Sequence, residues 1–219
     1  MKNVSKAEVI KTITGAVKEY DKKLANRDFL IAYKENQEIK FSCVGFRKHN
    51  FKHLTGVDTK LPSNVFYNKC IDGKLSPKDF EIDNKGKVAQ KMVVLPYLGE
   101  VLYKNCMIGQ FINSGIAIRA DYFVGGTRVY ICVGIRNSET NVDFPVSLYN
   151  EDIRKITAPS CRVLAIFAKE AKNRTYTECT FLAKNVELNK IKIPSEYSVS
   201  VMNNEIARTG GFKETGTHS

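Results

Sequence analysis

Hydrophobic residues recur at helical spacing at the start of the chain and then give way to strand-like runs. Val9, Ile10, Ile13 and Val17 share one face of a helix that a Ser5–Glu8 capping box would open, so we expect a helix over residues 6–25. Residues 29–33 and 39–46 alternate as strands do, and they predict a hairpin across residues 34–38.

Short helical segments follow this hairpin. Residues 50–54 predict a helical turn ended by Gly56, and Pro62 opens a second helix that ends near Gly73. A third short helix is expected from Ser76. Residues 86–105 have a helical pattern that contains Pro96, so we expect a break or kink at that proline.

The second half of the chain is rich in β-branched and aromatic runs bounded by Gly and Asn turns. Expected strands cover residues 107–111, 116–123, 127–135, 162–168 and 175–183. Their short spacing favours an antiparallel meander over alternating strand–helix units. The predicted fold class is therefore α+β, with N-terminal helices packed on one face of an antiparallel sheet. The tail, residues 191–219, has little apolar periodicity and is expected to be flexible.

Charge is the feature of composition that bears most on function. The 34 Lys and Arg against 23 Asp and Glu give a net charge of +11, and residues 1–60 hold the largest share of the excess. A positive field of this kind attracts phosphate backbones or anionic lipid. The plainer alternative is that the charge only aids solubility. We expect nucleic acid as the partner.

The cysteines and the absence of apolar segments bear on the compartment. Six cysteines are present, none in a Cys-x-x-Cys pair, and with three histidines a zinc site is not expected. No secretory signal and no apolar stretch of membrane-spanning length is visible. Buried free thiols in a reducing cytoplasm are the simplest interpretation.

A cationic segment between a predicted strand and helix holds the most reactive side chains. His49 and His53 lie within residues 47–56, beside Arg47, Lys48 and Lys52. Imidazole exchanges protons near neutral pH, and neighbouring cations would favour its neutral form and help to hold a phosphate. The alternative is a solvated basic loop that carries an ordinary histidine.

The same segment begins an ordered set of weak motifs. Phe51-Lys52-His53-Leu54-Thr55-Gly56 is followed by Phe66-Tyr67, and then by matching stretches at residues 104–111, 132–134, 144–148, 151–154, 162–166 and 183–184. Together they resemble the barnase–EndoU–colicin–RelE-like (BECR) nucleases of phages and mobile elements, over residues 28–190. Val146 stands where the family pattern has Asn, and Gln110 stands where an acidic residue is usual.

The resemblance implies a fold, a domain layout and a chemistry. An N-terminal helix (residues 1–27) would precede a BECR-like nuclease domain (residues 28–190) of helices on a four-stranded antiparallel sheet. The implied reaction is RNA cleavage without metal or cofactor: a base activates the ribose 2′-hydroxyl, an acid protonates the leaving oxygen, and a cation or hydroxyl stabilises the phosphorane.

Mapped onto this sequence, the resemblance makes His53 the acid–base candidate. Ser147, Lys184 and Arg119 complete the catalytic set. The residues expected to contact nucleic acid are Arg47, Lys48, Lys52, Thr55, Lys60 and Tyr67. Structural alternatives remain for several: Tyr67 as a core residue, Ser147 as a helix cap, Lys184 as a solvated side chain, and Arg119 on the solvent face of a strand.

The leading hypothesis is a metal-independent RNA endonuclease, a toxin or effector of a phage or mobile element, with transfer RNA among the candidate substrates. The alternative is a non-enzymatic basic effector that binds nucleic acid or inhibits a host defence nucleoprotein. A structural virion component is a third hypothesis, which predicts a large exposed apolar interface. The enzyme requires that His53 converge with a cation and a hydroxyl. No membrane partner is expected, whereas a host or phage protein is a further candidate.

Overall fold

The N-terminal helix forms as its sequence predicts. A computed structural model describes residues 4–83, 86–112 and 120–201 of the chain. Helix α1 spans Lys6–Lys23, and the capping box between Ser5 and Glu8 is present at its start. Val9, Ile13, Val17 and Tyr20 bury the apolar face of α1, while lysines in the last turn complement the helix dipole.

The predicted hairpin is longer and its turn tighter than expected. Strands β1 (Arg27–Glu35) and β2 (Glu38–Phe46) pair antiparallel up to Glu35 and Glu38. Only Asn36 and Gln37 form the turn, with φ angles of 48° and 73°. Two positive φ angles in succession match the twist of the flanking strands, which is why so short a connection suffices.

The helices after the hairpin follow the turn signals closely. Helix α2 (Asn50–Thr55) ends at Gly56 with φ 74°, and helix α3 (Ser63–Ile71) is followed by Gly73 with φ 68°. Helix α4 (Lys87–Val94) changes into the 3₁₀ helix η1 (Leu95–Glu100) at the predicted proline, Pro96. The break arises because proline has no N–H to donate to the preceding turn.

The helix predicted from Ser76 is wrong. The Asp79 carboxylate accepts hydrogen bonds from the backbone N–H and the hydroxyl of Ser76, at 2.8 and 2.9 Å, and Asp79 N–H donates to Ser76 O. The segment is thereby held as a turn. The backbone then bridges Asp58 to Glu81 instead of entering a helix. Short polar side chains favour this local closure over helix propagation.

The sheet is antiparallel throughout, and it confirms the predicted α+β class. Its strands run in the order β2-β1-β7-β3-β4-β5-β6, with β9 also paired to β7. The long strand β7 is the centre of the sheet: it pairs with β1 along one edge, and with β3 and then β9 along the other. The remaining bounds are β3 Cys106–Phe111, β4 Tyr122–Gly126, β5 Cys132–Arg136, β6 Phe144–Tyr149, β7 Thr157–Glu170 and β9 Glu178–Leu182.

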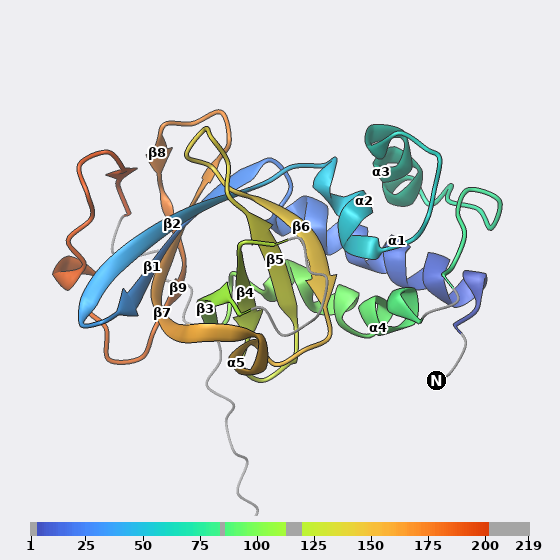
Figure 1. The fold of residues 1–219 in the computed structure, drawn as a ribbon. Coiled ribbons are helices and arrows are strands. Elements are labelled where there is room, and N and C mark those ends of the chain that lie inside the picture. Colours follow the sequence, from blue (N-terminus) through green and yellow to red (C-terminus); the bar gives the residue numbers. More distant parts are fainter. Residues whose placement is uncertain (1–3, 84–85, 113–119, 202–219) are drawn as a thin grey trace, which may run out of the picture.

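The sheet is larger than the four strands that the resemblance implies: the N-terminal hairpin joins it through β1, and six further strands of the described chain, β3–β7 and β9, complete it. It also curls. Gly45 N–H donates to Asp143 O at 2.8 Å and Asp143 N–H donates to Cys43 O at 2.9 Å, which links β2 to the chain just before β6. The two ends of the strand order therefore lie side by side in a half-barrel (Figure 1).

Strand β6 has no counterpart among the predicted strands. Pro145 lacks an N–H, and the register against β5 shifts between Gly134 and Ile135, so β6 is a bulged strand. It leads into the single-turn helix α5 (Ile153–Ile156). The Asp152 side chain caps this helix by accepting from Arg154 N–H at 3.0 Å, so the alternative in which Ser147 is the cap is wrong.

Alternation along the strands separates two apolar layers. Phe29 and Ile31 of β1 face the core beneath α1–α4 and η1, whereas Leu30 and Ala32 face the opposite side. Helices α1–α4 and η1 therefore cover one face of the sheet, as predicted (Figure 1). The described cysteines are all free and buried, which confirms the predicted buried thiols.

The C-terminal segment covers part of the opposite face. Strand β8 (Thr175–Tyr176) pairs in parallel with β10 (Ser198–Val199), and the short 3₁₀ helix η2 (Leu188–Lys190) lies between β9 and β10 along the chain. Ile191 is buried in the apolar layer that includes Leu30. Residues 191–201 of the expected flexible tail therefore belong to the fold, and residues 202–219 lie outside the described part.

Candidate functional site

Helix α2 is fixed at its start by a polar junction and along its inner face by apolar packing. Arg47 N–H donates to Asn50 Oδ1 at 2.7 Å, and the Tyr20 hydroxyl donates to Arg47 O at 2.8 Å. Phe51 and Leu54 are buried against the core, so the helix presents His53 to solvent. The most reactive side chain of the predicted site thus stands on a short, well-anchored helix.

Lys91 of α4 joins this helix to the sheet. Its ammonium donates to the backbone carbonyl of His53 at 3.2 Å and to Ser147 Oγ at 3.1 Å. Helices α2 and α4 both pack against β6, and α2 lies beside β6 in Figure 1. The structure therefore brings two predicted catalytic residues, His53 and Ser147, together around a cation that the sequence did not single out.

Gly56 explains how Lys91 reaches this position. A Cβ placed on Gly56 would lie 2.5 Å from Lys91 Cδ and 3.0 Å from Lys91 Cε. The lysine stem passes directly over the glycine that ends α2. Gly56 thus has two local roles, because it adopts the left-handed conformation at the helix end and leaves room for the stem.

Both titratable groups of this site hold a proton less firmly than usual. Burial lowers the pKa of Lys91 to about 8, with a further lowering by Lys87 and a smaller opposing effect of Asp83. The pKa of His53 is also lowered, first by partial burial and then by Lys52, His49 and Lys91. An imidazole that is neutral near pH 7 and an ammonium that can release its proton are suited to general acid–base chemistry.

The Lys91 position carried a signal in the sequence. Val88, Met92 and Leu95 form the apolar stripe of residues 86–105, and Lys91 lies within that stripe at helical spacing. A lysine on the buried face of a helix is unusual, because its charge must find partners there. The stripe identifies Lys91 as a polar residue on an apolar face, but it does not reveal the partners.

Two of the predicted nucleic-acid contacts point inward. The buried Thr55 donates its hydroxyl to Lys52 O at 2.7 Å, which closes the last turn of α2. Tyr67 is 1% exposed, packs edge-on against Phe51, and donates its hydroxyl to Asp21 Oδ1 at 2.5 Å. Tyr67 is thus a core residue, as in the structural alternative.

The predicted basic residues differ in how freely they can meet a ligand. Arg47 is paired with the buried carboxylate of Asp28 at 2.6 Å, and Lys52 donates to Leu61 O at 2.7 Å. Lys48 is half exposed, with its ammonium 3.7 Å from Asp21 Oδ1 and 5.4 Å from the centre of the Tyr67 ring. Lys60 is exposed beside Leu61, and is thereby close to α2. Lys48 and Lys60 are the more accessible cations near His53.

The other two catalytic candidates do not join His53 in the described structure. Lys184 is exposed just after β9, where its backbone carbonyl accepts from Arg162 at 2.9 Å. In Figure 1, β9 and α2 lie on different sides of the molecule. Arg119 lies outside the described residues.

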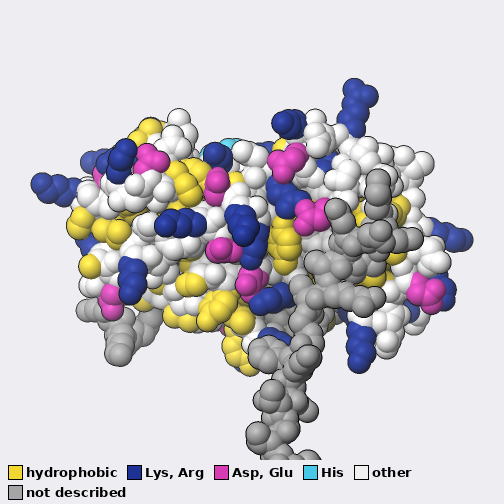
Figure 2. Space-filling view, turned by 180° about the vertical axis from the view of Figure 1, so that it is seen from behind, with side chains coloured by type: hydrophobic (Ala, Val, Ile, Leu, Met, Phe, Trp, Pro, Cys, Tyr) yellow, Lys and Arg dark blue, Asp and Glu magenta, His cyan; other side chains and the backbone are white. Residues whose placement is uncertain are grey.

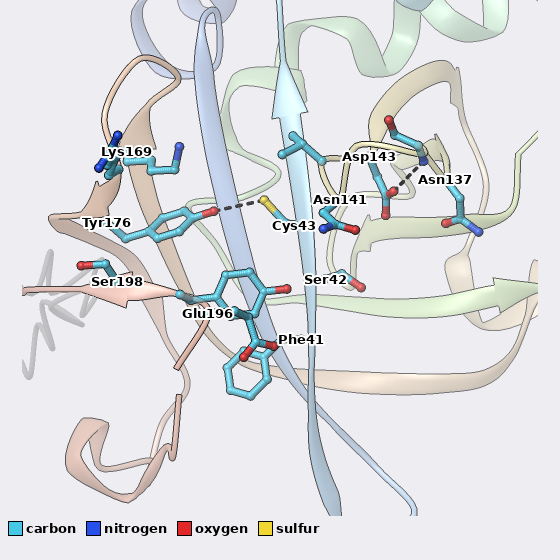
Figure 3. A pocket seen from close by; sticks show the side chains of 14 residues that line it. Phe41, Ser42, Cys43, Asn137, Asn141, Asp143, Lys169, Tyr176, Glu196 and Ser198 are labelled. Atoms are coloured by element: carbon cyan, nitrogen blue, oxygen red, sulfur yellow. Dashed lines mark hydrogen bonds between the residues drawn. The ribbon is translucent and has the colours of Figure 1, made fainter. Parts of the chain in front are cut away.

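Two cavities lie away from His53, where β2 meets the chain just before β6. One, of about 580 Å³, lies between β2, the loop before β6, β8 and β10 (Figure 3). The other, of about 540 Å³, is lined by residues of β1, β3 and β4 and by Asn137 and Asp143. Ser42, Asn137 and Asp143 border both cavities, so the two adjoin each other.

Comparison with known families identifies the class of protein. The family model of the phage-Barnase-EndoU-ColicinE5/D-RelE like nuclease4 group, PBECR4, matches residues 12–185. The chain belongs to this family of phage-type nucleases. No curated protein and no solved structure matches the chain. The match confirms the resemblance carried by the motifs, and it extends further toward the N-terminus than they do.

Two further observations concern metals and membranes. Within residues 4–83, 86–112 and 120–201, no group of three or more His, Cys, Asp and Glu side chains is arranged to hold a metal ion. No helix of the same described residues combines the length and apolarity that a membrane crossing requires.

Proposed function

We propose that the protein is a metal-independent RNA endonuclease whose acid–base centre is formed by His53, Lys91 and Ser147. The observation that supports this proposal is the position of Lys91, whose ammonium bonds both the His53 backbone and the Ser147 hydroxyl. A base candidate, a cation and a hydroxyl thus converge from three elements. Membership of a nuclease family makes a phosphodiester the bond to be cleaved.

In the proposed reaction, neutral His53 takes the proton of a ribose 2′-hydroxyl as that oxygen attacks the adjacent phosphorus. The bond from phosphorus to the 5′-oxygen breaks, and Lys91 gives its proton to the leaving oxygen. The products are a 2′,3′-cyclic phosphate and a 5′-hydroxyl. Ser147 orients Lys91 and can donate to a non-bridging oxygen, where negative charge develops in the transition state.

The biological part of the proposal follows from the family. A phage or mobile-element nuclease of this kind would act as a toxin or effector on RNA, transfer RNA included, in the cytoplasm of a bacterial host. Lys184 and Arg119 remain candidates for stabilising charge on the RNA. Neither is required by the three-residue centre.

The direct test is incubation with total RNA and with transfer RNA in EDTA, comparing wild type, His53→Ala and His49→Ala. His49 is the matched control because it is an exposed histidine at the start of the same helix. We expect wild-type cleavage that leaves cyclic phosphate ends. His53→Ala should lose about 10²–10⁴-fold in rate, the usual cost of removing an acid–base group. His49→Ala should stay within a few-fold of wild type.

Other outcomes would separate the alternatives. Cleavage that requires magnesium, or that persists in His53→Ala, would contradict the mechanism. Salt-sensitive RNA binding without cleavage of any RNA would instead favour the non-enzymatic effector. Val146, which replaces the asparagine of the family pattern beside Ser147, would then be the first residue to revert.

A further inference from the structure

The cavity of about 580 Å³ has the size of a small-ligand site and is built from four separate segments of the chain. Its walls come from β2, from the loop of residues 137–143, from the end of β7 with β8, and from residues 196–198. None of its lining residues belongs to the His53 centre. Figure 3 shows the side chains converging on this space.

The lining offers an aromatic surface. Phe41 and Tyr197 lie with ring centroids 6.2 Å apart and planes tilted by 34°, and both are only partly buried. Tyr176 lies deeper, with its hydroxyl 3.0 Å from the Cys43 thiol. Partly exposed aromatic rings beside a cavity can stack on a planar ligand, and every nucleobase has such a face.

The rim offers hydrogen-bonding groups that remain available. The side-chain amides of Asn137 and Asn141 are exposed, and neither makes a hydrogen bond to another described residue. An asparagine amide both donates and accepts, which is the pattern required to read the edge of a base. Arg174 is exposed at the same rim and has no ion pair within the described residues.

The charge of the cavity limits the ligand. Lys169 forms an ion pair with Asp28 at 2.8 Å. Asp143 accepts hydrogen bonds from the Tyr122 hydroxyl at 2.7 Å and from Ser138 N–H at 2.9 Å. Within the described residues, Arg174 then remains as the unpaired cation of the lining, beside the carboxylates of Asp143 and Glu196. This balance suits a base and ribose with a single phosphate better than a polyphosphate.

We propose that this cavity is a base-reading subsite for a nucleotide of single-stranded RNA that flanks the cleaved bond; the proposal rests on the proposed ribonuclease function. Asp143 precedes β6 and Ser147 lies four residues further on, roughly 13 Å along a strand. That span is on the order of four stacked nucleotides. One RNA strand can therefore reach both places.

One wall of the cavity, residues 196–198, lies beyond residue 185, where the match to the family model ends.

The test uses the full-length protein and the four nucleoside 3′-monophosphates, whose binding needs no cleavage. Asn141→Gly removes the amide but keeps the left-handed conformation, in which φ is 61°. Asn185→Gly is the matched control, because Asn185 has φ 66° and does not line the cavity. Tyr197→Ala removes a stacking surface. Titrations followed by NMR give the four affinities for each variant.

We expect wild type to prefer one base by about tenfold, and Asn141→Gly to reduce that preference while Asn185→Gly retains it. Tyr197→Ala should weaken all four ligands by about tenfold. Equal affinity for all bases, or binding no tighter than that of inorganic phosphate, would overturn the subsite. RNA cleavage without base preference would reject the subsite alone. Base-selective binding without cleavage would reject only the nuclease mechanism.

Discussion

At the scale of single residues, Lys91 is the least expected feature of the molecule. Burial makes the charged form of a lysine less stable than it is in water, and this cost lowers the pKa of Lys91 to about 8. The group keeps a charge at neutral pH because the His53 carbonyl and the Ser147 hydroxyl solvate it. A lysine held in this state can donate a proton far more readily than a surface lysine.

The two titrations predict a bell-shaped pH profile for cleavage. The rate should rise as His53 loses its proton, through a pKa below the ordinary 6.5, and should fall as Lys91 loses its proton near pH 8. Lys91→Arg keeps the charge but has no proton to give in this range. Its residual activity should lack the alkaline limb, and kcat should fall by about 10²–10⁴-fold.

The measurement is the pH dependence of kcat/KM on one RNA oligonucleotide from pH 5 to 10. Lys91→Met serves as the neutral comparison of similar length. A Lys91→Arg enzyme that retains both the wild-type rate and the alkaline limb would show that Lys91 is a structural cation. The acid would then have to be sought elsewhere.

Residue roles were only partly predictable from sequence. His53 was identified because a histidine among basic residues can be recognised as an acid–base candidate from the sequence alone. Tyr67 could not be placed, because its position between Phe51 and Asp21 depends on how α1, α2 and α3 pack. The pairing of Lys91 with Ser147 joins residues 56 positions apart and depends on the packing of α4 against β6.

At the scale of elements, the end of α2 is coupled to α4 through the contact between Gly56 and Lys91. We predict that Gly56→Ala destabilises the fold and also impairs cleavage. Alanine at φ 74° costs about 1 kcal/mol. Its Cβ would also lie 2.5 Å from Lys91 Cδ, so the lysine stem must shift and the hydrogen bond to Ser147 is disturbed.

Gly73→Ala is the matched control for this prediction. Gly73 also has a positive φ, 68°, but an added Cβ would meet nothing within 4 Å. Urea unfolding should show a loss of about 1 kcal/mol for Gly73→Ala with normal cleavage. Gly56→Ala should lose more stability and most of its activity. Equal behaviour of the two variants in both assays would show that the contact with Lys91 has no consequence.

Elements were well predicted where local chemistry decides them. The capping box of α1, the glycine end of α2 and the proline break after α4 are local signals, and each prediction was confirmed. Strand β6 was missed because its proline and its bulge disrupt the alternation by which strands are recognised. The helix expected at Ser76 failed because the Asp79 side chain holds a turn instead.

At the scale of the whole molecule, the class of fold could be predicted but its closure could not. A change from helical to alternating periodicity is enough to indicate helices on an antiparallel sheet. The link from β2 to Asp143 forms only because the sheet twists until its two ends meet. Local sequence patterns do not indicate how far a sheet twists. Both cavities border that junction, so they could not be predicted from local sequence patterns.

The distribution of charge over the surface is also a property of the whole fold. The net charge is +11, yet on the face shown in Figure 2 Lys and Arg are scattered among Asp, Glu and exposed hydrophobic side chains. Such a face does not form a continuous track for a phosphate backbone. Lys48 and Lys60, the accessible cations near His53, are the ones we expect to matter for RNA.

The last prediction compares two double variants of equal net charge. Lys48→Gln with Lys60→Gln removes two cations near His53. Lys155→Gln with Lys104→Gln removes two exposed cations, one from α5 and one from the chain between η1 and β3, that neither line the cavity of about 580 Å³ nor belong to α2. Each lysine that neutralises a phosphate of single-stranded RNA releases condensed counterion, which contributes about 0.7 to the slope of log K against log salt.

We expect the variant near His53 to bind RNA more weakly at low salt and to lose roughly 1.4 from that slope, while the distant variant keeps the wild-type slope. Fluorescence anisotropy with a labelled oligonucleotide at several salt concentrations measures both quantities. Because the two proteins carry the same net charge, an equal loss in both would mean that the overall field, not a local contact, attracts the RNA. A loss confined to the Lys155 and Lys104 variant would place the RNA away from both α2 and the cavity and would contradict the proposed site.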